Sequence, residues 1–203
     1  MTEVKSVLNV SNELKKIIEI VEKNKKGKGN KKQEKDRKEE IDKKIDKKEE
    51  KKEEKREIDD NYDRLINEVI KDIEKGILNL NLEEYIKPGG ICEGIAGAVG
   101  YIGKLKRSQL RKFFNEIKTI EYDLKSGEDV KKIKIRILAL IPKLAYTRGR
   151  DLIDENFYEF MKTILSKVKE DMNEENAQVV FEVFVKILES IVAYHTYHFP
   201  KEA

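Results

Sequence analysis

Between Ser108 and Lys125 the apolar residues recur every three or four positions, and this spacing is the strongest constraint on the fold. Because an α-helix turns by about 100° per residue, such positions lie on one face of a helix. We expect Ser108 to be the N-cap, because its hydroxyl can accept a hydrogen bond from an orphaned N–H group. A broad apolar face predicts a helix packed on a core. That face holds Leu110, Phe113, Ile117, Ile120 and Leu124, with Phe114 at its border.

The opposite face of this predicted helix is cationic. Arg111, Asn115, Lys118 and Tyr122 fall there together. Glu116 and Glu121 oppose the positive charges of the segment. Such a row is either an ordinary solvated helix surface or a surface that follows nucleic-acid phosphates, and both interpretations stay open. The segment holds six cationic residues, which are Lys104, Lys106, Arg107, Arg111, Lys112 and Lys118.

The same periodicity returns along the rest of the chain and predicts an all-α fold. We expect a compact bundle of about five or six helices over residues 59–203, with Asp59 or Asp60 capping the first. Later helices are expected to start at Asp129, at Asp151 or Asp154, and at Asn173 or Asn176. The last helix is apolar on nearly all sides, which is typical of a buried helix. No apolar run reaches the roughly 18 residues of a membrane span, so no membrane contact is expected.

Residues 1–58 have a different composition. They carry 20 Lys and Arg against 15 Asp and Glu, whereas the remaining residues carry 23 against 25. A short helix ending near Asn24 and a Lys/Glu-rich segment through Glu57 are predicted to form a flexible N-terminal extension, either a solvated linker or an RNA-tethering arm. Because residues 59–203 are not basic overall, a nucleic-acid site there has to be a local patch.

A second cationic row follows the segment that begins at Val130. Lys132, Arg136 and Lys143 stack at spacings of four and seven, and Arg150 continues the row if the helix extends that far. Tyr122 and Tyr146 offer rings on which exposed bases can stack. Two rows form one surface only if their helices pack side by side. Long cations contact phosphates without reading bases, so this pattern predicts salt-sensitive RNA binding without sequence preference.

Three enzymatic interpretations fit poorly. The segment from Ala98 to Lys104 resembles a phosphate-binding loop, but Leu105 stands where a hydroxyl residue is needed and no strand precedes it. Its small residues are better explained by close helix packing, through Gly90, Gly94 and Ala98.

His195 and His198 are too few for a zinc site, and Cys92 is the only cysteine. The same pair as an acid–base RNA nuclease lacks a nearby cation for the phosphate. We therefore expect His195 to be a packed or capping residue, and we expect no metal, no cofactor and no catalysis. A single cysteine allows no intrachain disulfide and favours a reducing cytoplasmic compartment.

Three ordered stretches resemble the small-subunit family of type III-A CRISPR–Cas effector complexes (the Csm small subunit). The resemblance extends over Asp59 to Pro200 and leaves residues 1–58 uncovered. The stretches are Gln109-Leu110-Arg111-Lys112-Phe113-Phe114, Pro142-Lys143-Leu144-Ala145-Tyr146-Thr147-Arg148-Gly149-Arg150, and Ala193-Tyr194-His195.

The resemblance implies a non-catalytic subunit whose copies stack along the complex and line the groove holding guide RNA paired with target RNA. Self-association and contacts with other subunits are expected, and cleavage belongs to those subunits. The matching motifs imply phosphate contact for Arg111, Lys112, Lys143 and Arg150. Our predicted RNA-binding set adds Arg107, Lys118, Lys132, Arg136 and Arg148. We expect a core role for Leu110, Phe113, Phe114, Leu144, Ala145 and Tyr194.

The alternative is a helical scaffold that makes only protein contacts. In that interpretation the cationic rows are ordinary solvent-facing surfaces, and the apolar last helix or the small-residue helix is the interface. Charge reversal that leaves assembly unaltered would favour the scaffold. A third class, a nucleotide-dependent or metal enzyme, would require an activity that depends on Lys104 or His195.

Overall fold

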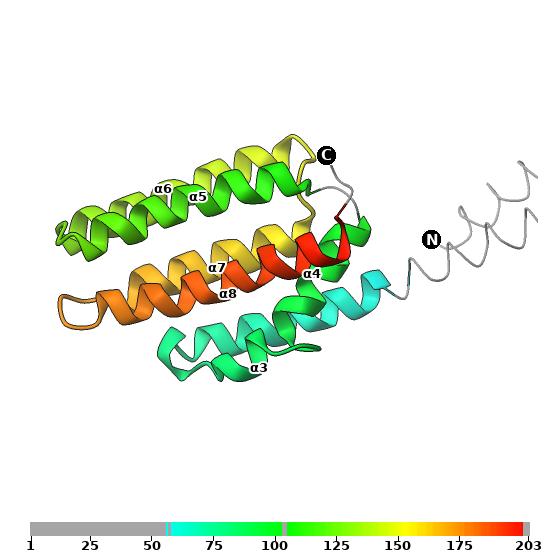
Figure 1. The fold of residues 1–203 in the computed structure, drawn as a ribbon, viewed down its shortest axis with the longest axis horizontal. Helices are drawn as coiled ribbons and strands as arrows, with labels where there is room; N and C mark the ends of the chain where they lie inside the picture. Colours follow the sequence, from blue (N-terminus) through cyan, green and yellow to red (C-terminus); the bar gives the residue numbers. More distant parts are fainter. Residues whose placement is uncertain (1–55, 57, 103–104, 201–203) are drawn as a thin grey trace, which may run out of the picture. The chain divides into compact units, whose positions relative to one another are not determined.

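The computed structural model describes residues 56, 58–102 and 105–200, and all of them belong to one compact unit, Glu54–Ala203. Every regular element in this part of the chain is helical, which confirms the all-α prediction (Figure 1). The predicted helix ending near Asn24 and the Lys/Glu-rich extension lie outside the described residues, as do Gly103 and Lys104.

The first described helix runs over residues 58–74, and residue 56 is also helical. Asp59 and Asp60 therefore lie inside this helix, and the prediction that one of them caps it is wrong. Ile58, the residue before Asp59, is half-buried, and it extends the apolar face of this helix by one residue. The other elements are η2 (Ile77–Asn79), α3 (Leu82–Ile86), α4 (Ile91–Ile102), α5 (Arg107–Lys125), α6 (Val130–Gly149), α7 (Glu155–Asp171) and α8 (Ala177–His198).

The helix α8 lies at the centre of the bundle. It packs against α4 and α5, while α7 packs mainly against α6 (Figure 1). The apolar faces predicted from periodicity meet here, and Ile117, Phe160, Phe181 and Ile191 are at most 1% exposed. Each such side chain stabilises the fold by roughly 1.5–3 kcal/mol through removal from water. The hairpin of α5 and α6 is thereby held on one side of the bundle.

Aspartates cap two of the long helices as predicted. Asp129 accepts hydrogen bonds from the backbone N–H groups of Lys131 and Lys132 at 2.8 and 3.2 Å, and Asp154 accepts one from Phe157 at 2.8 Å. The prediction for α5 is wrong, because Lys106 occupies the cap position and Ser108 lies inside the first turn.

The N-terminus of α5 is instead capped by the side chain of a glutamine. The Oε1 atom of Gln109 accepts a hydrogen bond from the backbone N–H of Lys106 at 3.1 Å. This side chain satisfies an N-terminal donor from the third helical position, which is half of a capping box. It allows the helix to begin one residue before Ser108.

The glycines of α4 allow close packing rather than phosphate binding. A Cβ atom at Gly94 would lie 3.1 Å from Cδ2 of Leu65, and one at Gly100 would lie 2.0 Å from the ring of Phe199. The residues after α8 therefore pack against α4 at a position that only glycine leaves open. This confirms the close-packing interpretation at Gly94 and shows a second instance at Gly100.

Candidate nucleic-acid interface

The helices α5 and α6 pack side by side as an antiparallel hairpin (Figure 1), so the two predicted cationic rows share one surface. Two ion pairs join the helices, one between Arg136 and Asp123 and one between Lys143 and Glu116. Both pairs fit one register of the hairpin, because Glu116 lies seven residues before Asp123 on α5 and Lys143 lies seven residues after Arg136 on α6. Seven residues are about two helical turns. The row on α6 thus faces α5.

The same register brings Arg150 opposite Gln109, two turns further along. Gln109 has no negative charge, so Arg150, the fourth member of the row, meets no carboxylate there. The Arg150 guanidinium instead lies 5.6 Å from the ring centroid of Tyr146, and its Nη1 lies 3.5 Å from the tyrosine hydroxyl. We name this part of the hairpin, formed by the first turns of α5 and the last turns of α6, the open end.

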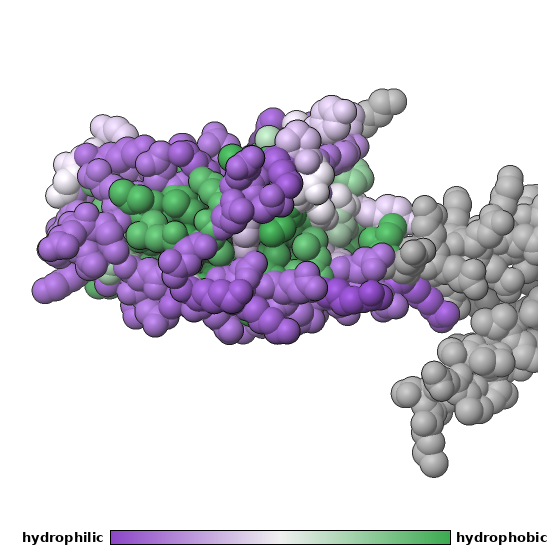
Figure 2. All heavy atoms as spheres, turned by 90° about the horizontal axis from the view of Figure 1, so that it is seen from below, coloured by the Kyte–Doolittle hydropathy of each residue, from purple (hydrophilic) through white to green (hydrophobic). Residues whose placement is uncertain are grey.

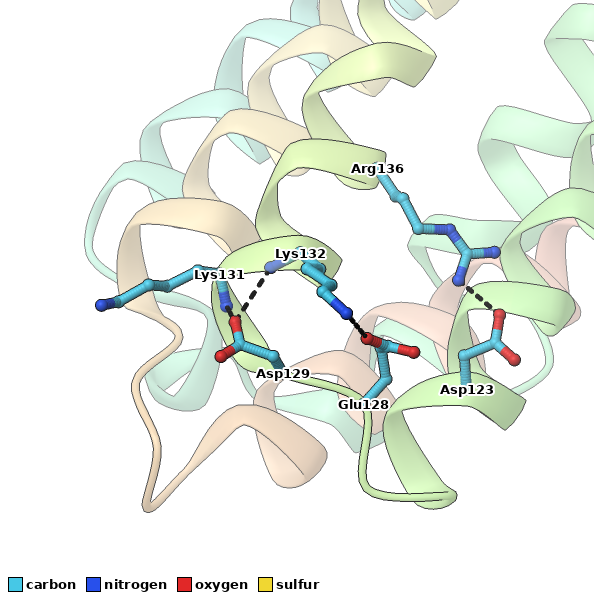
Figure 3. Close-up of polar contacts among 6 residues, drawn as sticks. All are labelled: Asp123, Glu128, Asp129, Lys131, Lys132 and Arg136. Atoms are coloured by element: carbon cyan, nitrogen blue, oxygen red, sulfur yellow. Dashed lines mark hydrogen bonds and ion pairs between the residues drawn. The ribbon is translucent and has the colours of Figure 1, made fainter.

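The other part, beside the connecting loop, is named the turn end. Figure 3 shows the Arg136 side chain directed at Asp123 and the Lys132 ammonium directed at Glu128, at 2.8 Å for the latter pair. The hydrogen bond from Lys132 to the Glu128 carboxylate raises the pKa of the lysine above its usual value. The cations of the row are therefore balanced by carboxylates at the turn end.

Glu121 contributes to the same balance on α5. Its carboxylate lies 2.5 Å from Lys118 and 2.7 Å from Lys125, and the residue is buried. Burial opposes ionisation of the carboxyl group, but the two ammonium groups outweigh it and hold the pKa of Glu121 below its usual value. Lys118 is thus engaged within its own helix.

The nine predicted RNA-binding residues fall into two groups. Five form ion pairs inside the described part of the chain: Lys118, Lys132, Arg136, Lys143 and Arg148, the last with Glu155 at 2.8 Å. Arg107 donates a hydrogen bond to the carbonyl oxygen of Pro200 at 3.1 Å. Arg111 and Lys112 are exposed, and no carboxylate among the described residues pairs with them or with Arg150. Among the nine predicted residues, those without a carboxylate partner in the described part of the chain therefore lie at the open end.

A groove of about 250 Å³ lies between the two helices at the open end. Its cationic rim is formed by Lys112, Lys143 and Arg150, and Tyr146 stands beside them with 66% of its surface exposed. Tyr122 is 72% exposed but does not line this groove. The remaining lining is largely apolar and includes Phe113, Leu144, Leu152 and Phe157.

Most of the expected core residues near the site are confirmed. Leu110 and Leu144 are buried, and Phe113, Phe114 and Tyr194 pack half-buried against the core. Ala145 is exposed, so its predicted core role is wrong. It lies on the side of α6 that turns away from both α5 and α7.

The carboxylates that organise the row were missed at the level of sequence. Periodicity shows Glu116 only as a charge that opposes the cations of α5, and it gives Asp123 no role. Their seven-residue spacing on α5 repeats the spacing of Arg136 and Lys143 on α6. A matched spacing of acids on one helix and cations on the next is the sequence signal for ion pairs across a helical hairpin.

The other candidate chemistries occupy structural positions. His195 is fully buried, with its ring centroid 5.3 Å from that of Phe199, so it is a packed residue as expected. His198 pairs with Glu93 at 2.7 Å. Burial raises the pKa of the Cys92 thiol to about 12, which makes it a poor nucleophile at neutral pH. Among the described residues, no group of three or more His, Cys, Asp or Glu side chains could hold a metal ion.

Two apolar surfaces lie outside the groove. On α6, Ile135 and Leu138 are 66% and 41% exposed, and the exposed Pro142 and Ala145 continue this α6 apolar row at helical spacing. Figure 2 shows a second apolar strip between polar borders, on the face that carries the helix over residues 58–74 and α3. No described helix is long and apolar enough to cross a lipid bilayer.

Comparison with protein families gives one match. The model described as Csm2 Type III-A matches residues 90–201, which span α4 to α8 and include the whole hairpin, the groove and all nine predicted RNA-binding residues. No curated protein and no solved structure matches the chain. The family match covers more than half of the chain and agrees with its all-helical structure. The chain therefore belongs to the Csm2 family of type III-A CRISPR–Cas systems and is a subunit of the Csm effector complex.

Proposed function

We propose that this subunit is non-catalytic and binds the backbone of the guide and target RNA through the open end of the α5–α6 hairpin. The observation that carries the proposal is the change along the row on α6. Arg136 and Lys143 are balanced by carboxylates of α5, whereas the same register places Arg150 opposite Gln109, and the exposed Arg111 and Lys112 follow Gln109 on α5.

Phosphate is the ligand that suits this group of cations. Arginine forms two parallel hydrogen bonds to a phosphate group, and lysine adds a mobile point charge. Contacts to the phosphate backbone fix the position of the protein but carry no sequence information. Binding is therefore expected to be independent of sequence, as a subunit that follows many different guide RNAs requires.

The remaining predicted residues have a secondary part in this proposal. Lys118, Lys132, Arg136, Lys143 and Arg148 reach RNA only by leaving a carboxylate, which offsets part of the gain. We assign the direct phosphate contacts to Arg111, Lys112 and Arg150, with Arg107 beside them. Lys143 is the first of the paired residues to join, because it also lines the groove.

Copies of the subunit and other subunits of the complex contact its apolar surfaces in this proposal. Apolar patches on a protein surface mark sites of protein association. The α6 apolar row lies on the same helix as Arg150, so a neighbouring copy seated on it continues the RNA-binding surface. We propose no cofactor and no metal, and cleavage of RNA belongs to other subunits.

The test is a salt series of RNA binding by the full chain. Fluorescence anisotropy of a labelled single-stranded RNA of arbitrary sequence is measured from about 50 to about 200 mM salt, where phosphate contacts weaken steeply. Arg111→Glu/Lys112→Glu is expected to lower the affinity at least about a hundredfold, because two charge-assisted hydrogen bonds are lost. It should also flatten the dependence on salt.

The matched control is Lys131→Glu/Lys134→Glu, which makes the same charge change on α6 outside the row. Circular dichroism shows whether each variant stays helical. A selective loss in the first variant supports the proposal. Equal losses in both variants would show that RNA responds to overall charge, and unchanged binding in both would show that the open end is not the RNA site.

A protein-scaffold function is the second candidate, and the α6 apolar row favours it. Ile135→Lys/Leu138→Lys is expected to weaken association of the subunit in sedimentation velocity and in the assembled complex. If that variant is lost from the complex while Arg111→Glu/Lys112→Glu is retained together with its target RNA, the subunit is a scaffold without RNA contact of its own.

A further inference from the structure

We infer that the groove at the open end binds one unpaired base of single-stranded RNA, stacked on Tyr146, while Lys112 and Arg150 hold the neighbouring phosphates. The inference rests on the proposed function and adds a ligand class to the same site. It starts from an aromatic ring at the rim of a cationic groove, which is the combination found in sequence-tolerant single-strand binding sites.

The ring of Tyr146 is available and its orientation is held. The residue is 66% exposed on the last turns of α6, so most of its surface meets solvent. The Arg150 guanidinium lies 5.6 Å from the ring centroid, with Nη1 at 3.5 Å from the hydroxyl. This contact restrains the tyrosine and places a positive charge over one face of its ring, so a base would stack on the opposite face. A phosphate next to that base is then within the reach of the arginine side chain.

The groove suits a single planar group. Its volume of about 250 Å³ lies just below the roughly 300–1,000 Å³ of clefts that hold drug-sized ligands. Phe113, Leu144 and Leu152 give the groove an apolar lining. The face of a base loses little free energy when it leaves water to contact such a lining. Lys112 lies at the rim and pairs with no carboxylate among the described residues, so an apolar peptide segment would bury its charge without a partner.

Several polar groups in the lining are engaged within the protein, including the Glu116 carboxylate, which pairs with Lys143. Oε1 of Gln109 accepts a hydrogen bond from the Lys106 backbone at 3.1 Å, and the Thr147 hydroxyl donates to the Lys143 carbonyl at 2.8 Å. Few groups therefore remain to read the edge of a base. We expect stacking without base preference. Because bases inside a duplex are stacked on one another, we also expect preference for single-stranded over double-stranded RNA.

The experiment combines two signals from one oligonucleotide. A uridine-rich single-stranded RNA carries a terminal fluorescein, which reports binding by anisotropy, and one internal 2-aminopurine, whose emission reports stacking. A matched oligonucleotide has abasic sites in place of its bases and keeps the same phosphates. The full chain is titrated into each, together with Tyr146→Leu, Tyr146→Phe and the control Tyr122→Leu, which removes an equally exposed ring outside the groove.

We expect the wild type to bind the base-containing RNA about tenfold more tightly than the abasic RNA, and to change the 2-aminopurine emission. Tyr146→Leu should remove both effects and leave binding of the abasic RNA unchanged. Tyr146→Phe should restore them, and Tyr122→Leu should behave as the wild type. Thermal melting by circular dichroism shows whether each variant keeps the fold.

Three results overturn the inference, and they differ in what else they overturn. Equal binding of the two RNAs, with affinity still lost in Arg111→Glu/Lys112→Glu, removes the base site and leaves the phosphate-binding function standing. Absence of salt-sensitive binding to either RNA removes both. Tight binding of free uridine monophosphate in competition with the RNA would also contradict it, because the site would then be a nucleotide pocket.

Discussion

The two ends of the α5–α6 hairpin have similar residues and different electrostatics. At the turn end, Arg136 and Lys132 each meet a carboxylate, Asp123 and Glu128 (Figure 3). At the open end, Arg150 faces Gln109 and a tyrosine ring instead. Lys132 and Arg136 at the turn end are paired with carboxylates, whereas Arg111, Lys112 and Arg150 at the open end pair with no carboxylate among the described residues.

The comparison shows that a count of lysines and arginines does not locate a nucleic-acid site. The row on α6 is regular in sequence, and its charge is cancelled over the part where α5 supplies acids in the same register. A ligand phosphate has to compete with those carboxylates at the turn end and meets no such competitor for Arg150 among the described residues. In the proposed function the register of the hairpin therefore selects the binding end, and changes in the acids should move or remove it.

Gln109→Glu places an acid opposite Arg150, and it has the largest expected effect of the single substitutions that test this comparison. The new carboxylate would face Arg150 as Glu116 faces Lys143, so the affinity for single-stranded RNA should fall about tenfold at low salt, the loss of one charge-assisted contact. Anisotropy titration measures the change. A glutamate at this position keeps the capping hydrogen bond to Lys106, so the helix should start as before.

The control for this prediction is Gln109→Ala, which removes the same side chain without adding charge. It is expected to lower the stability of α5 and to leave RNA affinity nearly unchanged. Equal weakening by both variants would mean that the glutamine itself contacts the RNA.

Asp129→Ala tests the turn end as a purely structural region. The aspartate caps α6 through two backbone N–H groups, so its loss should lower the free energy of unfolding by about 1 kcal/mol, measured by urea titration. RNA affinity should not change. Ser126→Ala in the same loop removes only an exposed hydrogen bond to Tyr122 and should cost less. A drop in RNA affinity with Asp129→Ala would extend the binding site to the turn end.

Glu116→Gln removes an acid from the middle of the hairpin. Lys143 would lose its ion pair and turn to the groove. RNA affinity should then rise by about threefold, which is part of the free energy of one charge-assisted contact. Asp123→Asn makes the same kind of change beside Arg136, further from the groove, and should leave the affinity nearly constant. A larger gain in RNA affinity with Asp123→Asn than with Glu116→Gln would contradict the assignment of RNA binding to the open end.

Glu121→Gln should have the smallest effect and only on stability. The pKa of Glu121 is lowered in the folded chain, so its ionised form contributes stability above the usual carboxyl value of 4.5, and this is lost as the pH falls through the lowered pKa. At neutral pH the variant should lose less than about 0.5 kcal/mol. Urea titrations at neutral pH and below pH 4.5 should show the difference from the wild type shrinking in acid. A constant difference would mean that packing, not charge, sets the role of Glu121.

The sequence determined the helices and the faces that they bury. The three- and four-residue spacing of apolar side chains is a local property, and it placed Leu110, Ile117 and Leu124 in the core correctly. Caps at Asp129 and Asp154 followed from the same local chemistry. The predicted start of α5 was wrong because Ser108 and Gln109 both offer a local cap. The side chain of Gln109 caps the helix, which therefore begins before Ser108.

Only the tertiary structure decided which cations are free to bind. Ion pairing between α5 and α6 depends on how far one helix is shifted along the other, and the apolar spacing allows several shifts. The packing also left the α6 apolar row exposed, with Ala145 in it, because α6 has apolar residues on two faces and the bundle covers one. Electrostatic pairing and burial are properties of neighbours in space, so periodicity along one chain could place Arg150 on a face but could not show that Gln109, rather than an acid, lies opposite it.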